Sequence, residues 1–321
     1  MNKALKKWLS VLIPLLLGIF FVVYAYQQFS PEQISQIKDY FKSANYSYIY
    51  MSIGFGFVGA FARAYRWKFT LEHLGYKVPF KNQFFAVNVG YLMNMFIPRS
   101  GEISRAVVLT KYNNVPFDKG FGTIVAERVI DLILLGLFVS VVFFLQFDVV
   151  KTFVLDHIPR EKAFFVVILL LVLGLASLWA YKYSKIKFIH LLKEKLSGLQ
   201  EGILSVIHMK NKWAFLFFTL LIWGSYIMMF YIAIFAFSET STLNFEAVIT
   251  TFVVGSIAIA FTNNGLGSYP FLVSEILLFY GVAATTGTAF GWIVWTSQAL
   301  FTIEIVVLIN TNNKKITFFI R

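Results

Sequence analysis

The sequence predicts an all-α polytopic membrane protein with six spanning helices and two re-entrant, broken-helix hairpins in an inverted repeat. Three observations support this fold class. Of the 321 residues 58% are hydrophobic and only 14% are charged, against about 25% charged residues in soluble domains. Several apolar runs reach the roughly 20 residues that a helix needs to cross a bilayer. Two other apolar segments are interrupted by Asn, Gly and Pro at corresponding places in the two halves of the chain.

Each half of the chain reads as span, span, hairpin, span. We expect one transmembrane domain, 1–321, with the first repeat over about 8–147 and the second over about 163–310. In order, the predicted elements are 8–26, 46–63, 84–112, 121–147, 163–181, 213–237, 247–281 and 286–310. The expected hairpins are 84–112 and 247–281, because the pieces beside each interruption have only 11 to 15 residues, short of a full span. A pair of tilted short spans is the alternative and would give the same topology.

The positive charges orient this arrangement. If both hairpins enter and leave on one side, twenty of the 28 Lys and Arg residues lie on one face of the membrane and five on the other. Such a bias marks the cytoplasmic face. We therefore expect a multi-pass protein of a bacterial inner membrane with both termini in the cytoplasm. Each half has an odd number of spans, so the two halves run in opposite orientations.

Two further features belong to the expected cytoplasmic face. The segment 185–210 repeats apolar residues at three- and four-residue steps among Lys and Glu, which predicts an amphipathic helix in the headgroup plane or, alternatively, a solvated connector. Arg63 and Arg66 close the second span, where they either attract anionic headgroups or act as stop-transfer charge. Trp67 beside them is expected to be an interface anchor.

The composition also excludes several kinds of site. Cysteine is absent, which removes disulfides and thiolate metal sites, and the four histidines lack ligand spacing. We find no nucleophile–base pair, metal set or nucleotide loop, so we expect no enzyme activity, no cofactor and no metal. The positive residues behind the net charge of +12 are distributed as expected for a protein at a membrane surface. The charge therefore does not indicate nucleic-acid binding.

The first hairpin carries charge at membrane depth, where a charged residue costs about 2.5–3.5 kcal/mol on the gentler insertion scale. Asn94, a predicted substrate-binding residue, precedes the interruption, and Pro98 and Gly101 are its expected hinges. Arg99, Glu102 and Arg105 follow at three-residue steps on the first turns of a half-helix, whose N-terminal end favours anions. Either these arginines bind a phosphate group, or the Arg-Glu-Arg cluster only pins the hairpin; both can hold together.

The next span carries Glu127, Arg128 and Asp131. Glu127 and Asp131 share a helix face, and Arg128 neighbours Asp131 three residues on. The simplest role of this group is to pair with the hairpin arginines, with Arg128 a further phosphate ligand. A proton relay is the alternative, because neighbouring buried carboxylates have raised pKa values.

The second hairpin is nearly uncharged. Its interruption contains Asn264, a predicted binding residue, and the expected hinges Gly265, Gly267 and Pro270, with Glu275 beyond it as a supporting or relay group. The glycines permit left-handed turns and close backbone approach. The two halves are therefore chemically unequal: the first is expected to take a charged headgroup and the second to supply a hinge or outer wall.

Three motifs together carry a family resemblance. They are the run Asn94 to Leu109 with its Pro-x-x-Gly-Glu-x-x-Arg core, the Glu-Arg-x-x-Asp group at Glu127, and Asn264-Gly-Leu-Gly with Glu275. The element Arg63-x-x-Arg66-Trp67 is also similar. With them the chain resembles, over roughly residues 10–310, the lysylphosphatidylglycerol synthase transmembrane-region family. The resemblance implies a lipid-translocating membrane domain. We expect no lysyl-lipid synthesis, because the chain carries no aminoacyl-transferase domain.

These observations lead to one expected function and two alternatives. We expect a flippase for an anionic or phosphate-bearing lipid, with polyprenyl-phosphate-linked lipids among the candidates, and membrane lipids as its partners. The alternatives are an intramembrane lipid-modifying enzyme, with Glu127 or Asp131 as general base, and a non-transporting subunit of an envelope biosynthesis complex. The oligomeric state is open, because Gly54, Gly56 and Gly59 allow close helix packing within one chain as readily as between two.

Overall fold

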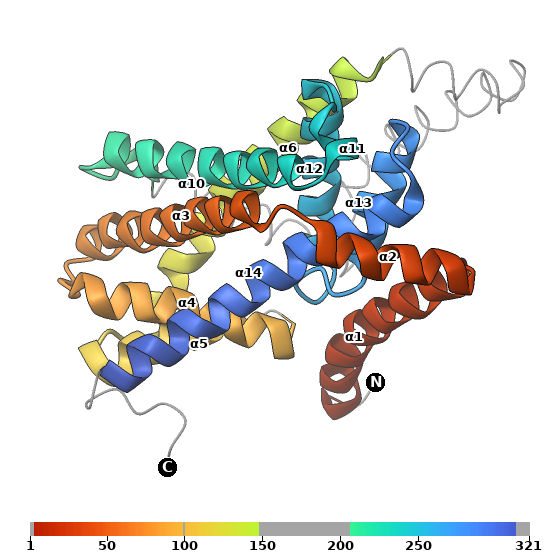
Figure 1. The fold of residues 1–321 in the computed structure, drawn as a ribbon. Helices are drawn as coiled ribbons and strands as arrows, with labels where there is room; N and C mark the ends of the chain where they lie inside the picture. The colour runs from red at the N-terminus through yellow and green to blue at the C-terminus, as the bar shows by residue number, and fades with distance from the viewer. Residues whose placement is uncertain (1–2, 99, 148–205, 313–321) are drawn as a thin grey trace, which may run out of the picture. The chain divides into compact units, whose positions relative to one another are not determined.

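The computed structural model describes residues 3–98, 100–147 and 206–312, and every regular element in those ranges is a helix (Figure 1). The chain forms two compact units. The larger combines Met1–Ile124 with Met209–Arg321, and the smaller is Val125–His208. Arg99, the predicted span 163–181 and nearly all of the predicted amphipathic segment 185–210 lie outside the described residues.

The described helices include long apolar ones and shorter ones. In chain order they are α1 (Lys3–Gln27), α2 (Pro31–Ser43), α3 (Tyr46–His73), α4 (Phe80–Phe96), α5 (Ser100–Asn113), α6 (Phe117–Leu145), α10 (Lys212–Ala233), the 3-10 turn η1 (Ile234–Ala236), α11 (Ser238–Ser241), α12 (Phe245–Phe261), α13 (Ser268–Phe279) and α14 (Ala284–Asn312). Among the described residues three helical stretches are long and apolar enough to cross a membrane: Phe117–Leu145, Lys212–Ala236 and Ala284–Leu308. The all-helical membrane fold is confirmed; the six spans, the re-entrant hairpins and the inverted repeat stay predictions.

Helix α3 is longer than the sequence predicted. The prediction ended the second span at residue 63, where charge begins, but the helix continues to His73 because no Gly or Pro interrupts it before Gly75. Arg63, Arg66 and Trp67 are consequently buried, with 4%, 0% and 0% of their surface exposed. Trp67 is therefore not an exposed interface anchor, and the attraction of the two arginines for anionic headgroups stays a prediction.

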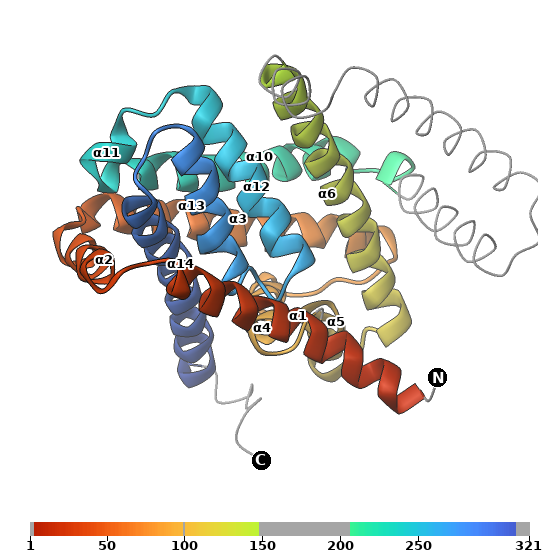
Figure 2. The same ribbon diagram turned by 90° about the vertical axis from the view of Figure 1, so that its right-hand side faces the viewer.

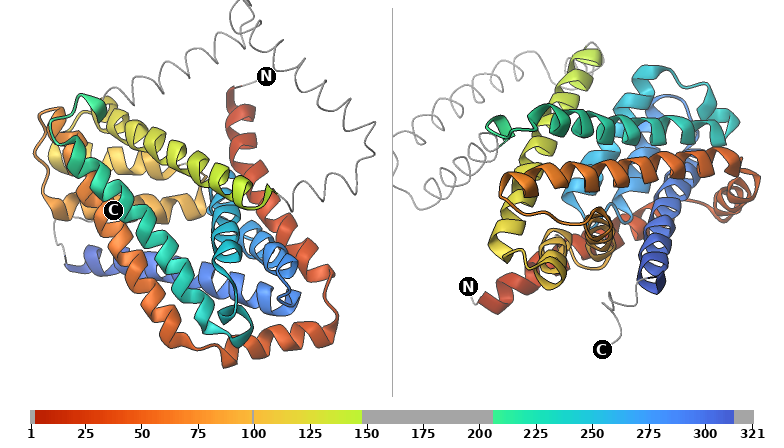
Figure 3. Two further views of the ribbon diagram at one scale, coloured as in Figure 1. Left: turned by 90° about the horizontal axis from the view of Figure 1, so that it is seen from above. Right: turned by 90° about the vertical axis from the view of Figure 1, so that its left-hand side faces the viewer.

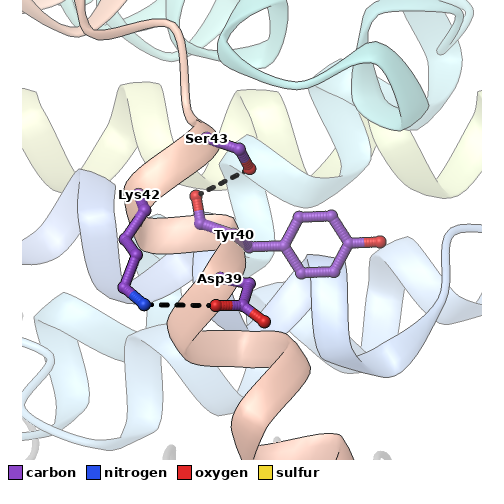
Figure 4. A network of polar contacts seen from close by, with 4 residues as sticks. All are labelled: Asp39, Tyr40, Lys42 and Ser43. Carbon is purple, nitrogen blue, oxygen red and sulfur yellow. Dashed lines mark hydrogen bonds and ion pairs between the residues drawn. The ribbon is translucent and has the colours of Figure 1, made fainter.

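Helix α2 was not predicted, although its start carries a clear signal. The amide of Gln33 donates to Ser30 Oγ (3.3 Å), and the amide of Ser30 donates to Gln33 Oε1 (2.9 Å), which is a capping box with Pro31 at the first turn. Near its other end Lys42 lies 3.3 Å from Asp39, as Figure 4 shows. Such an exposed ion pair contributes little stability.

Helices α3 and α10 run antiparallel, side by side, through the larger unit (Figures 1 and 3). Ser52 Oγ donates to Met229 O (2.8 Å) toward one end, and Arg66 Nη1 donates to Thr219 Oγ1 (3.2 Å) toward the other. Between them Gly59 brings the helices close: a Cβ there would lie 2.9 Å from a ring carbon of Tyr226. Gly56 and Gly59 thus serve packing within this chain, whereas nothing lies within 4 Å of a Cβ at Gly54.

Two pairs of shorter helices complete the larger unit. Helix α4 packs beside α5, and α12 beside α13 (Figure 2). The first pair is separated by residues 97–99 and the second by 262–267, which are the interruptions seen in the sequence. Helix α14 contacts both α4 and α13, and α1 packs on α13 through Phe21 and Phe271, whose ring centroids are 5.2 Å apart. Both interruptions therefore lie in one packed unit.

Candidate functional site

The first helix break is closed by contacts between α4 and α5. Asn94 Oδ1 accepts a hydrogen bond from the amide of Gly101 (2.7 Å), and Ser100 Oγ donates to Met93 O (2.9 Å). Gly101 lies directly on Gly90, since a Cβ at Gly101 would overlap the Gly90 carbonyl oxygen. The amide of Gly101 belongs to the first turn of α5, where amides lack partners within the helix, so Asn94 acts as its cap. Binding of substrate by Asn94 stays a prediction.

This tight crossing places Arg105 of α5 in the interior. Arg105 is 2% exposed, and its guanidinium carbon lies 4.1 Å from the centroid of the Trp67 ring of α3. Its stem passes over α4, where a Cβ at Gly90 would lie 2.8 Å from Arg105 Cγ. Trp67 is itself fixed, because its Nε1 donates to Thr123 Oγ1 (2.8 Å). Arginine over tryptophan is the strongest of the common cation–π pairs, and more so when water is excluded.

Two further arginines of α3 lie toward α10. Arg63 faces the ring of Tyr226 at 6.0 Å, and the Tyr226 hydroxyl is 3.0 Å from that of Tyr91 on α4. Arg66 lies 5.3 Å from the centroid of the Phe215 ring of α10. We call Arg63, Arg66, Arg105 and Trp67 the buried arginine cluster. None of its arginines stands alone, since each has further interactions.

The chemistry of the buried arginine cluster is that of anion recognition. A guanidinium stays charged in a protein interior, because its pKa lies too high for burial to neutralise it. It presents planar, forked donors that match carboxylate and phosphate oxygens. Three such groups from α3 and α5 are buried, each beside an aromatic ring, and their chemistry suits an anionic group.

The second helix break has a different geometry. Asn264, Gly265 and Gly267 have φ values of +52°, +77° and +70°, which is the left-handed conformation that the glycines predict. Trp295 of α14 donates through Nε1 to Asn264 O (2.9 Å). Gly267 packs against the backbone of Gly18 on α1, where a Cβ would overlap the Gly18 carbonyl oxygen. The break is therefore held by two helices outside its own pair.

The two breaks meet. Asn263, at the start of the second break, donates from Nδ2 to the carbonyl oxygen of Met95, two residues before the first break (3.0 Å). Asn263 is 2% exposed, so this contact is shielded from solvent. It joins segments 168 residues apart in the chain. The same helix, α4, thus contacts Arg105 at Gly90 and the second break at Met95.

The remaining predicted site residues are dispersed. Glu102 is half-buried at the start of α5, and Glu275 is exposed on α13, away from the breaks. Pro98 lies in the first break, and Pro270 is buried against Gly291 of α14, where a Cβ would lie 2.7 Å from Pro270 Cα. Arg99 lies outside the described residues.

Glu127, Arg128 and Asp131 belong to the smaller unit. Glu127 is 0% and Asp131 8% exposed, and Arg128 Nη1 lies 3.8 Å from Asp131 Oδ2. The pairing three residues apart is the one that the spacing predicts. Their proposed partnership with the hairpin arginines stays a prediction.

Sequence reasoning missed Arg63, Arg66 and Asn263 as interior polar groups. The spacing of Arg63, Arg66 and Trp67 is helical and could have suggested a shared face, but charge at the end of an apolar run more often marks a membrane boundary. Nothing in the local sequence indicates that Asn263 meets Met95.

Comparison with known proteins gives a family. The family model described as the lysylphosphatidylglycerol synthase TM region matches residues 11–303. The UPF0104 membrane protein MJ1595 of Methanocaldococcus jannaschii is 42% identical over 69 residues, which are 21% of this chain and 20% of that protein. The match thus spans about a fifth of that relative's length. No solved structure matches the chain.

Proposed function

Because the chain belongs to the lysylphosphatidylglycerol synthase TM-region family, we propose that it is a flippase for an anionic or phosphate-bearing membrane lipid. The family and the apolar helices establish a multi-pass membrane protein of a lipid-related family. The observation that carries the proposal is the buried arginine cluster. Ionisable residues inside a membrane domain are expensive and usually functional.

The chemistry of the cluster favours phosphate as the recognised group. Forked arginine donors bind phosphate oxygens more specifically than a lysine point charge does. A translocator needs to shield only the headgroup, because the apolar chains can stay in the bilayer. Phospholipids and polyprenyl-phosphate lipids both meet that requirement. Arg105 and Arg63 are the proposed headgroup ligands here, and the roles of Arg99, Arg128, Glu102, Glu127 and Asp131 stay predictions from the sequence.

In this proposal the two helix pairs are re-entrant, enter from opposite faces of a bacterial inner membrane and open alternately, with both termini cytoplasmic. Broken helices in corresponding places of two halves are typical of transport sites at a repeat interface. The hydrogen bond from Asn263 to Met95 O supports this role, because a movement of one break would directly displace the other.

The proposal is tested by measuring translocation of fluorescent phospholipid and polyprenyl-phosphate analogues in proteoliposomes. We expect Arg105→Gln to reduce transport by about 100-fold, and Arg105→Lys by about tenfold, because lysine keeps the charge but loses the fork. Arg63→Gln should fall between them. Lys42→Gln is the matched control, because it removes one positive charge from a side chain that is 79% exposed.

Transport by Arg105→Gln at the wild-type rate, in protein that elutes as a single folded species, contradicts the headgroup site. If the wild-type protein moves none of the anionic lipids, the flippase proposal is contradicted. Turnover of a headgroup in detergent, where no sidedness exists, then favours a lipid-modifying enzyme. Stable co-purification with a biosynthetic partner, without activity alone, favours a subunit role.

A further inference from the structure

The second helix break contains a buried acceptor that no donor meets. Asn263 Nδ2 donates to Met95 O, and a carbonyl oxygen can only accept. This contact therefore fixes the amide orientation and directs Asn263 Oδ1 away from Met95. Among the described residues Oδ1 is buried and has no hydrogen-bond partner. Buried polar atoms are nearly always satisfied, so this oxygen indicates a missing positive or donor group.

The hydroxyl groups that close the break add a second acceptor. Thr262 Oγ1 donates to Ala258 O (2.7 Å) and lies 2.7 Å from Ser268 Oγ. Each hydroxyl has one hydrogen, so Ser268 must donate to Thr262 Oγ1. Ser268, which is 0% exposed, is then left with oxygen lone pairs that meet no donor in the described part of the chain. The break thus has more acceptors than donors.

The backbone adds to this negative character. Helix α12 ends at Phe261, and the carbonyl end of a helix carries partial negative charge. In transporters with broken helices, unwound carbonyls and the C-terminal ends of half-helices coordinate Na+. The break offers amide, hydroxyl and carbonyl oxygens without a carboxylate. Among the described residues no group of three or more His, Asp or Glu could hold a metal ion, so the set suits a monovalent rather than a divalent cation.

We propose that the break between α12 and α13 binds Na+ through Asn263 Oδ1, Ser268 Oγ and main-chain oxygens at the end of α12. A small cation satisfies acceptor oxygens without needing any donor from the protein. It sits beside the contact of Asn263 with Met95 and stabilises the arrangement in which the two breaks meet. Binding does not depend on lipid transport; if the flippase proposal holds, the same site lets a Na+ gradient act on the breaks.

The test is thermal unfolding of the purified full-length protein in detergent, with NaCl replacing N-methyl-D-glucamine chloride at constant ionic strength. We expect the unfolding midpoint to rise with Na+ and to saturate, and to respond less to K+. Ser268→Ala and Asn263→Leu should each raise the half-saturating Na+ concentration by about tenfold or more, as loss of a supporting contact typically does at cation sites. Ser268→Ala is needed because Asn263→Leu also removes the contact with Met95.

Ser274→Ala is the matched control. Ser274 is a buried serine of the same helix, 4% exposed, whose hydroxyl donates to Ala284 O outside the break (3.1 Å), so this variant should keep the wild-type Na+ response. Equal midpoints of the wild type in Na+, K+ and N-methyl-D-glucamine overturn the proposal, and an equal response to Na+ and K+ overturns the choice of Na+. A Na+ response unchanged in Ser268→Ala and Asn263→Leu places the cation elsewhere and also overturns it.

Discussion

The two helix breaks satisfy their exposed backbone in different ways. In the first, the support comes from the pair itself: Asn94 of α4 caps Gly101 of α5. In the second, Thr262 and Ser268 also bond within the pair, but further support comes from elsewhere, since Trp295 of α14 binds Asn264 O and α1 packs against Gly267. The capping of the first break is thus self-contained, whereas the shape of the second break also depends on two other helices. A substitution in the second break should therefore disturb more helices of the larger unit than a substitution in the first break does.

The breaks also differ in charge. The first pair carries Glu102 and Arg105 close behind its break, and Arg105 extends into the buried arginine cluster. The second break has amide and hydroxyl groups, and the two acidic residues of its pair, Glu246 on α12 and Glu275 on α13, are exposed. The first break is charged, and the second is neutral and supported by other helices. This difference suits the predicted division, in which the first pair recognises the headgroup and the second supplies the hinge.

The largest expected effect tests which of the two breaks is destabilised more by an added methyl group. In Gly267→Ala the methyl group overlaps the Gly18 carbonyl, and the residue must keep a φ of +70°, so overpacking and left-handed strain together should destabilise the protein by about 2–5 kcal/mol. In Gly101→Ala the methyl group overlaps the Gly90 carbonyl, but the residue is helical, so the loss should be only about 1–3 kcal/mol. Unfolding in detergent measures both.

Gly54→Ala is the control for this pair, because nothing lies within 4 Å of a Cβ at that helical position. It should be neutral or slightly stabilising, since alanine is the better helix former. If Gly267→Ala is as stable as Gly54→Ala, the second break does not depend on α1.

The next effect compares the two asparagines that hold the breaks. Asn94→Leu leaves the Gly101 amide without its cap at the start of α5, which should cost about 1–2 kcal/mol. Asn263→Leu leaves Met95 O without its donor but also removes the unsatisfied Oδ1, so in a solution without Na+ the two effects partly cancel and the loss should be about 1 kcal/mol or less.

Midpoints of unfolding at one salt composition distinguish these variants of Asn94 and Asn263. The matched control is Asn88→Leu: Asn88 is 1% exposed, and its Nδ2 bonds Phe84 O within α4 (2.8 Å). A larger loss in Asn263→Leu than in Asn94→Leu reverses the assignment of the self-contained break to the first pair.

The positions of the breaks could be predicted because they depend on local chemistry. Clusters of Asn, Gly and Pro such as those at 94–101 and 263–270 favour helix ends, and Gly265 and Gly267 mark left-handed turns without reference to the rest of the chain. The membrane class followed equally directly, because apolar helices of sufficient length have few other uses.

The interior contacts could not be predicted, because they depend on which helices become neighbours. The burial of Arg66 requires that α10 lie antiparallel to α3, and the bond from Asn263 to Met95 joins segments 168 residues apart. Hydrophobic periodicity gives the face of a helix but not its partner. Charge at residue 63 therefore predicts a membrane boundary, although the helix continues and buries it.

The smallest expected effect tests whether α2 also helps to support the second helix pair, through a contact with α11. The Tyr40 hydroxyl of α2 donates to Glu239 Oε1 (3.0 Å) of α11, the short helix before α12. Burial raises the pKa of Glu239, but hydrogen bonds from its own amide, Ser238 and Tyr40 outweigh this and lower it below the usual 4.5. A lowered carboxyl pKa stabilises the fold above the unfolded value and loses that contribution as the pH falls through the folded value.

Tyr40→Phe should therefore reduce stability at neutral pH by less than about 1 kcal/mol, because Glu239 is exposed and solvent screens the interaction. The difference between wild type and Tyr40→Phe should shrink as the pH falls below the ordinary glutamate pKa, which paired unfolding midpoints across that range can measure. Glu239→Gln is the control and should remove the pH dependence of the difference. A difference that stays constant with pH shows that Tyr40 acts by packing, through its ring on Phe237, and that the charge of Glu239 does not help to tie α2 to the second pair.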